Sequence, residues 1–216
     1  MRINKKNILF LILTGIMFHG FSQPSDFKLV TGSEKTEIEK KIIAAAKKIS
    51  SLQCKFEQEK TSVLLQEKAV SKGILVYKTP ASLRWEYTEP SKYVLIFHQD
   101  NVYIKDENGT TNAPKMLKQL GNFIISTING NSLIDNGNFQ IDYYENEKMK
   151  SVIWVKLTPI PKKLKDMYAS IQIKISTSDY LATEIVMEEK SGDKMKITLK
   201  DKKMNEDIPN NLFSKD

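Results

Sequence analysis

The chain has 216 residues, one cysteine and a formal net charge of +7, and 27% of its residues are charged. This length fits a single domain, and one cysteine excludes an intrachain disulfide. Its lysines are dispersed among aspartates and glutamates instead of forming one block, so the sequence gives no indication of a nucleic-acid-binding protein.

The N-terminus has the pattern of a secretory signal peptide over residues 1–22. Three basic residues precede an apolar run at 8–18, and the small residues Gly20 and Ser22 follow. We expect cleavage between Ser22 and Gln23. The apolar run is shorter than the about 20 residues that a membrane-spanning helix needs, and an uncleaved anchor is the alternative. Residues 23–32 show no period and are expected to be a flexible mature N-terminus.

An amphipathic helix is predicted next. Thr36 and Glu39 have the spacing of a capping box, and apolar residues then recur at helical intervals, at Ile38, Ile42, Ala45, Ile49 and Leu52. A helix lying on a membrane surface would carry bulkier anchors than these alanines. We therefore expect it to pack on a sheet.

A long series of extended segments with short breaks follows the helix. Short turns between neighbouring segments indicate antiparallel pairing. The fold class is therefore α+β and mainly antiparallel β, with about 10–11 strands in a sheet curved into an incomplete, half-open barrel. The expected strands are 54–60, 63–68, 70–78, 83–88, 93–98, 102–105, 139–144, 152–157, 169–176, 181–188 and 194–200.

The stretch 70–90 and the strand after it carry the clearest pattern. Apolar and aromatic side chains alternate with polar ones and share one face, at Leu83, Trp85, Tyr87, Tyr93, Leu95 and Phe97. The segment 74–77 is apolar on both faces, which indicates that something covers its outer side. The last apolar residues of the chain, Leu212 and Phe213, are expected to pack against the sheet.

The period changes to helical over 113–133. Met116, Leu120, Phe123, Ile124 and Ile128 form an apolar face. Gly121 lies inside this helix, where it costs ~1 kcal/mol relative to alanine, so a break or bend is expected there. The concave side of a curved sheet would accept the apolar face. The helix is then either a fixed part of the core or a lid that moves when a ligand enters.

The loop 158–168 contains two prolines and a basic cluster of Lys162, Lys163 and Lys165. Prolines and lysines are typical of an exposed loop. It is either an ordinary solvated loop or a segment that contacts a partner or lipid headgroups.

No catalytic, cofactor-binding or metal-binding motif occurs. The G-x-S-x-G, H-E-x-x-H, P-loop and C-x-x-C patterns are absent. Beyond the signal peptide, Cys54 and His98 are the single cysteine and histidine, on different predicted strands, so a thiol nucleophile has no obvious base. A non-enzymatic binding protein is favoured. A secreted hydrolase and a sensor or adhesion module that binds protein stay open as alternatives.

Several short motifs, taken in order, resemble the LolA family of periplasmic lipoprotein carriers over nearly the whole mature chain. They are Phe56-x-Gln58, Gly73, Pro80, Leu83-Arg84-Trp85-Glu86-Tyr87, Pro90 and Ile208-Pro209-Asn210-Asn211-Leu212-Phe213. The resemblance implies one carrier domain over 33–216, a periplasmic monomer whose half-open barrel is lidded by helices and encloses the acyl chains of lipoproteins. It also implies two partners, an inner-membrane lipoprotein-releasing ABC transporter and an outer-membrane lipoprotein receptor.

Specific roles follow for the apolar residues named above. We expect Leu83, Trp85, Tyr87, Tyr93, Leu95 and Phe97 to form the cavity wall, and Met116, Leu120, Phe123, Ile124 and Ile128 to form the lid. Which strand face lines the cavity is open. In the family, an arginine before the proline that matches Pro80 latches the lid, but this chain has Thr79. The candidate latch residues are therefore Thr79, Lys78 and Arg84, and a weaker latch is the alternative. A LolA-like binder of another lipid or of a hydrophobic metabolite is the nearest alternative function.

Overall fold

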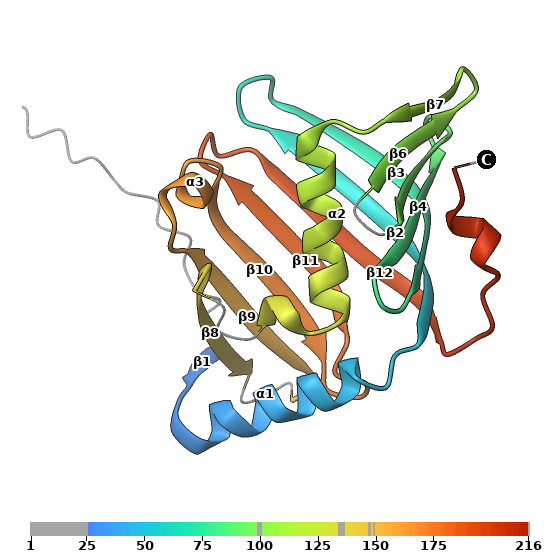
Figure 1. Cartoon of the computed structure of the whole chain (residues 1–216). Coiled ribbons are helices and arrows are strands. Elements are labelled where there is room, and N and C mark those ends of the chain that lie inside the picture. The colour runs from blue at the N-terminus through green and yellow to red at the C-terminus, as the bar shows by residue number, and fades with distance from the viewer. Residues whose placement is uncertain (1–25, 99–100, 134–136, 147, 149, 216) are drawn as a thin grey trace, which may run out of the picture.

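The structure is a computed structural model that describes residues 26–98, 101–133, 137–146, 148 and 150–215. Its described part forms one sheet of twelve strands in the order β1-β8-β9-β10-β11-β12-β2-β3-β4-β5-β6-β7. Every neighbouring pair is antiparallel. The sheet curves around helix α2 but leaves β1 and β7 as separate edges, so the predicted half-open barrel is confirmed (Figure 1).

The helices are α1 (Gly32–Ala46), α2 (Lys115–Ile128) and α3 (Lys162–Lys165), with short 3-10 turns η1 (Asn131–Leu133) and η2 (Asn210–Phe213). The first six strands are β1 (Phe27–Val30), β2 (Ser51–Ser62), β3 (Glu67–Lys78), β4 (Ser82–Glu89), β5 (Tyr93–His98) and β6 (Asn101–Asp106). The others are β7 (Gly109–Asn112), β8 (Phe139–Asn146), β9 (Val152–Pro159), β10 (Tyr168–Ser176), β11 (Ala182–Glu189) and β12 (Lys194–Met204).

The start of the described chain differs from the prediction. Residues 27–30, expected to be flexible, form the edge strand β1, which pairs with the end of β8. Helix α1 then begins at Gly32, whose φ of +62° turns the chain out of β1. The predicted capping box is therefore wrong, because Thr36 lies inside the helix and its hydroxyl donates to the Gly32 carbonyl at 3.4 Å.

Two further strand predictions were inaccurate. The expected strand at 63–68 is instead a turn at 63–66 that joins β2 and β3, two strands of 12 residues each. Its apolar Val63, Leu64 and Leu65 resemble a strand in sequence but are exposed. Strand β7 was missed because its residues, Gly109–Asn112, carry no apolar alternation and pair only with the neighbouring β6.

The concave face of the sheet holds the main core. Ile38 and Ile42 of α1 are buried against it, as predicted, and α1 lies across one end of the sheet (Figure 1). The third buried helix position is Ala46, in place of the predicted Ala45. Helix α1 therefore closes that end of the concave space.

A second, smaller core lies on the convex face. Val76 and Ile96 are buried there beneath Ile208 and Phe213, which the chain brings back from its C-terminus. The ammonium group of Lys78 donates to the Ile208 carbonyl at 2.6 Å and fixes this segment. The predicted cover over the outer side of 74–77 is thus confirmed. Phe213 is buried as expected, whereas Leu212 is exposed.

Truncation of Phe213 to alanine should lower the free energy of unfolding by about 3–5 kcal/mol, because it empties the convex-face core. Truncation of the neighbouring Leu212, which is exposed, should change it by less than about 0.5 kcal/mol. Urea unfolding followed by circular dichroism measures both. Equal effects of the two substitutions would contradict the convex-face core.

Candidate binding site beneath helix α2

The six predicted wall residues lie together on the concave face. Strands β4 and β5 pair them across the sheet as Leu83 with Phe97, Trp85 with Leu95, and Tyr87 with Tyr93. Tyr93 is half-buried and the other five are buried. The strand face that points inward, which the sequence left open, is therefore the one that carries these side chains.

Aromatic contacts make this wall continuous. The rings of Tyr87 and Tyr93 stack at 4.3 Å, and Phe56 of β2 meets the rings of both Trp85 and Tyr87 edge-on. The Tyr87 hydroxyl donates to the side chain of Gln58 at 2.9 Å, and burial raises the pKa of Tyr87 well above its usual range. In the described part of the chain the buried indole N–H of Trp85 has no acceptor.

Helix α2 lies over the concave face (Figure 1). Leu120, Ile124 and Ile128 are buried in the same core cluster as the wall, and Phe123 is half-buried at its edge. The predicted wall and these lid residues are thus brought together. Met116 belongs to α2, but its side chain lies outside what the structure describes.

Gly121 allows α2 to approach the wall closely. A Cβ atom at this position would overlap the ring of Phe97, a buried wall residue. Helix α2 runs without a break from Lys115 to Ile128, so the predicted break at Gly121 is wrong. Glycine at this position allows the close packing, which offsets its lower helix propensity.

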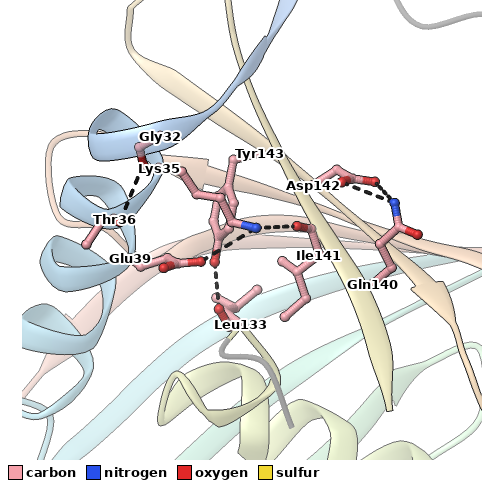
Figure 2. A network of polar contacts seen from close by, with 9 residues as sticks. All are labelled: Gly32, Lys35, Thr36, Glu39, Leu133, Gln140, Ile141, Asp142 and Tyr143. Atoms are coloured by element: carbon pink, nitrogen blue, oxygen red, sulfur yellow. Dashed lines mark hydrogen bonds and ion pairs between the residues drawn. The ribbon is translucent and has the colours of Figure 1, made fainter. Parts of the chain in front are cut away.

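A polar network holds the C-terminal end of α2. The buried hydroxyl of Tyr143 in β8 donates to the Leu133 carbonyl of η1 at 2.6 Å. Lys35 reaches across from α1, donates to the Ile141 carbonyl at 2.9 Å and lies over the Tyr143 ring (Figure 2). Burial, with a smaller effect of Glu39, raises the pKa of Tyr143, so its hydroxyl keeps its proton at neutral pH.

A cavity of about 280 Å³ lies on the other side of α2 from the wall. Phe123 and Leu120 face it, and no charged residue lines it. Its volume is just below the about 300–1,000 Å³ of typical ligand pockets. The sheet residues of this cavity were not predicted as site residues, because the sequence marks them only by the alternation around Ile171. They are Phe139, Tyr168, Ile171 and Met187, with Leu164 and Met167 from the segment at α3.

A larger groove of about 1,220 Å³ opens at the turn between β4 and β5. Its lining includes Tyr87 and Tyr93 but also the charged side chains of Arg84, Glu86, Lys92, Lys105, Asp106 and Glu107. An apolar ligand would leave these charges without solvent. The uncharged cavity beside Phe123 is therefore the better candidate for an apolar ligand.

The candidate latch residues lie away from α2. The Lys78 ammonium also donates to the side chain of Asn210 at 2.7 Å, and Arg84 donates to Glu86 at 2.9 Å and to the Leu212 carbonyl at 3.4 Å. Thr79 is exposed beyond the end of β3. Lys78 and Arg84 thus hold the C-terminal segment on the convex face.

Cys54 and His98 do not have the character of a catalytic pair. Burial raises the pKa of the Cys54 thiol to about 12, so the thiolate nucleophile is scarce at neutral pH. His98 is exposed, and its Nδ1 lies 2.9 Å from the Ser82 hydroxyl. Cys54 is accordingly a small apolar core residue.

Replacement of Gly121 with alanine should lower the free energy of unfolding by about 1–2 kcal/mol. Overpacking against Phe97 costs about 1–3 kcal/mol, which exceeds the ~1 kcal/mol that alanine gains in a helix. In a Phe97→Leu background the same substitution should be neutral or stabilising. Urea unfolding of the four proteins measures this, and a stabilising Gly121→Ala change in the wild-type background would disprove the close approach.

Cys54 should resist alkylation by iodoacetamide at pH 8 in the folded protein, because its pKa of about 12 leaves little thiolate and its side chain is buried. A Leu64→Cys variant supplies an exposed thiol for comparison. Mass spectrometry should find position 64 modified at least about 100-fold faster than Cys54. Comparable rates at both positions would contradict the burial of Cys54.

In the described part of the chain, no helix has the length and apolar character needed to cross a bilayer. A search of the curated proteins gave no match. Among solved structures, the similar ones include a LolA superfamily protein from Nitrosomonas europaea, with 13% identity, a TM-score of 0.46 and coverage of 84% of this chain and 97% of that one. Lipoprotein LppX from Mycobacterium tuberculosis has 11% identity, a TM-score of 0.47 and coverage of 83% and 99%.

An uncharacterized conserved protein from Thermus thermophilus has 11% identity, a TM-score of 0.49 and coverage of 82% of this chain and 91% of that one. These TM-scores fall below 0.5, so the assignment rests on sequence. The profile described as "Outer membrane lipoprotein carrier protein LolA" matches residues 47–216. Because this match spans well over half of the chain, the protein belongs to the LolA family of outer membrane lipoprotein carrier proteins.

Proposed function

We propose that this protein carries lipoproteins from the inner to the outer membrane by enclosing their acyl chains beneath α2. The observation that supports this most is the apolar concave face, where α2 packs against the β4–β5 wall on one side and borders an uncharged cavity beside Phe123 on the other. Members of the family are binding or carrier proteins. The proposal places the mature protein in the periplasm after cleavage between Ser22 and Gln23, which lie outside the described residues.

The energetics require α2 to move. Burial of an acyl chain is worth ~0.8 kcal/mol per methylene, so one long chain contributes on the order of 10 kcal/mol when fully enclosed. A cavity of about 280 Å³ holds only part of such a chain. Displacement of α2 from Phe97 enlarges the space, and the lost packing offsets part of the binding energy. The cargo therefore binds firmly but can still be released.

The contacts of α2 favour movement of its N-terminal end. Near its C-terminal end, the Thr127 hydroxyl lies 3.0 Å from the Ser132 hydroxyl of η1, in a buried position. Tyr143 holds the following η1 turn. These buried hydrogen bonds would be broken at a cost if this end lifted. The helix thus pivots about η1, and Met116 lies on the moving end.

Two partners belong to this proposal. An inner-membrane ABC transporter loads the carrier and an outer-membrane receptor unloads it. Lys78 and Arg84 bind the C-terminal segment, so closure of the lid rests on apolar packing, with no counterpart to the arginine latch of the family at Thr79.

The cargo identifies the function directly. The protein should be purified from its own periplasm without detergent, and the molecules that accompany it identified by mass spectrometry. Acylated lipoprotein is the expected result. Free lipid would instead favour a LolA-like carrier of another lipid, whereas ester turnover lost in a His98→Ala variant would favour a hydrolase.

Replacement of Phe123 with glutamate should lower the amount of co-purified lipoprotein at least about tenfold, because it places a carboxylate at an uncharged cavity. Phe123 is half-buried, so far-UV circular dichroism should stay close to wild type. The matched control is Ala44→Glu, which adds the same charge to an exposed position of α1. Loss of folding together with cargo would show that Phe123 belongs only to the core.

A further inference from the structure

The tip of the β2–β3 hairpin exposes three consecutive apolar side chains. Val63, Leu64 and Leu65 are 58%, 89% and 64% exposed. Single exposed apolar residues are ordinary on protein surfaces, but a run of them usually marks a contact with something else. The two long strands carry this tip outward at one end of the sheet (Figure 1).

The tip is joined to α3 through the β11–β12 turn. The Val63 amide donates to the Asp193 side chain at 2.8 Å. On the other side of the same turn, the Lys190 amide donates to the Met167 carbonyl at 3.2 Å, just after α3. The hairpin tip, this turn and α3 are therefore neighbours at one end of the molecule.

This end also carries unpaired positive charge. Lys162, Lys163 and Lys165 of α3 are exposed, and within the described residues none of them has an ion-pair partner. The adjacent Asp166 lies 4.0 Å from Lys190 instead. At the hairpin itself Lys68 is paired with Glu59, so the tip contributes apolar surface and α3 contributes charge.

We infer that this end of the molecule docks on the surface of a bilayer with anionic headgroups. Leu64 and Leu65 enter the boundary between headgroups and acyl chains, and the three lysines of α3 contact lipid phosphates. A narrow convex tip needs a matching pocket in a protein partner, whereas a bilayer accommodates it without one. Exposed apolar residues beside free lysines are the combination that binds anionic membranes.

The docked orientation brings the cavity to the membrane. Leu164 of α3 and Met167 line the cavity of about 280 Å³ beneath α2. The same short segment thus carries headgroup-binding lysines outward and a cavity side chain inward. This inference concerns empty membranes and does not rest on the proposed cargo, so its failure would leave the carrier proposal unchanged.

Vesicle flotation tests the inference. The mature chain is mixed with vesicles of phosphatidylcholine alone or with about one quarter phosphatidylglycerol, and the floated fraction is measured. We expect binding to the anionic vesicles, a loss of about tenfold or more in Leu64→Glu/Leu65→Glu, and a loss on the order of 100-fold when the three α3 lysines become glutamine. The variant with three glutamines should lose its preference for anionic vesicles over phosphatidylcholine vesicles and keep its remaining binding to both.

The matched control is Leu29→Glu, because Leu29 is 47% exposed in β1, which pairs with the far end of β8. This control should float like the wild type. Val63 is left unchanged in every variant because it packs closely on Gly192. Its side chain lies 3.3 Å from the position that a Cβ atom of Gly192 would take. Circular dichroism checks that each variant is folded.

Insertion is measured separately with an environment-sensitive fluorophore on Leu64→Cys, since the buried Cys54 is shielded from labelling. Its emission should shift to the blue on anionic vesicles and be quenched by nitroxide-labelled lipids. Failure of the wild type to float, or equal flotation of the Leu64→Glu/Leu65→Glu variant, would overturn the inference. The inference would also be overturned if the Leu64→Glu/Leu65→Glu variant floated normally but no longer transferred cargo to a purified protein acceptor. That result would assign the tip to a protein contact.

Discussion

The close approach of α2 to the β4–β5 wall is the constraint on which the rest of the structure depends. A helix can lie this near to a buried aromatic ring only if the contact position lacks a Cβ atom, and Gly121 meets that condition against Phe97. Gly73 plays a similar part within the sheet, because a Cβ there would overlap the Glu86 carbonyl. The β3–β4 register shifts at this same glycine, as is common where a sheet bends. Two glycines thus allow the sheet to curve and the helix to fill the curve.

The wall is packed on both of its sides. Its concave side contacts α2, while its convex side is covered by Ile208 and Phe213. Lys78 and Arg84 fix this cover through main-chain carbonyls. A displacement of α2 therefore leaves the wall supported, since the second core does not depend on the helix. The cover on the convex face, which looks unrelated to binding, gives the wall its rigidity.

The sequence predicted the shared apolar face of 83–97, the helix α2 and the outer cover because each depends on local periodicity, but it left open which strand face points inward. Alternation at 83–97 and helical spacing at 116–128 reflect which side of an element is buried. The role of Gly121 could not be predicted, because the close neighbour Phe97 is distant in sequence and helix propensity alone favours a bend. The prediction of a strand at 63–68 was wrong because it assumed that apolar side chains are buried. Here they are exposed at a turn.

The cavity was missed because its walls come from β8, β10, β11 and the segment at α3, which meet only in the fold. Because of its position, the two ends of the molecule differ in how much space they leave beside α2. At the α1 end, the space between α1 and η1 is only about 20 Å³ and is lined by Ile42, Ile128 and Leu133, while the Tyr143 network ties η1 to the sheet. The α3 end holds about 280 Å³ of uncharged space.

For the apolar ligand of the proposed function, the two ends differ as routes into the concave face. Entry at the α1 end would break buried hydrogen bonds at Tyr143 and Thr127, each of which leaves a buried polar group unsatisfied. Entry at the α3 end displaces apolar contacts of Phe123 and Leu164, and these are replaced by contacts with the ligand itself. Under the proposed carrier function, loading and release would take place at this same end, and a single surface around α3 would face both the donor and the acceptor of the cargo.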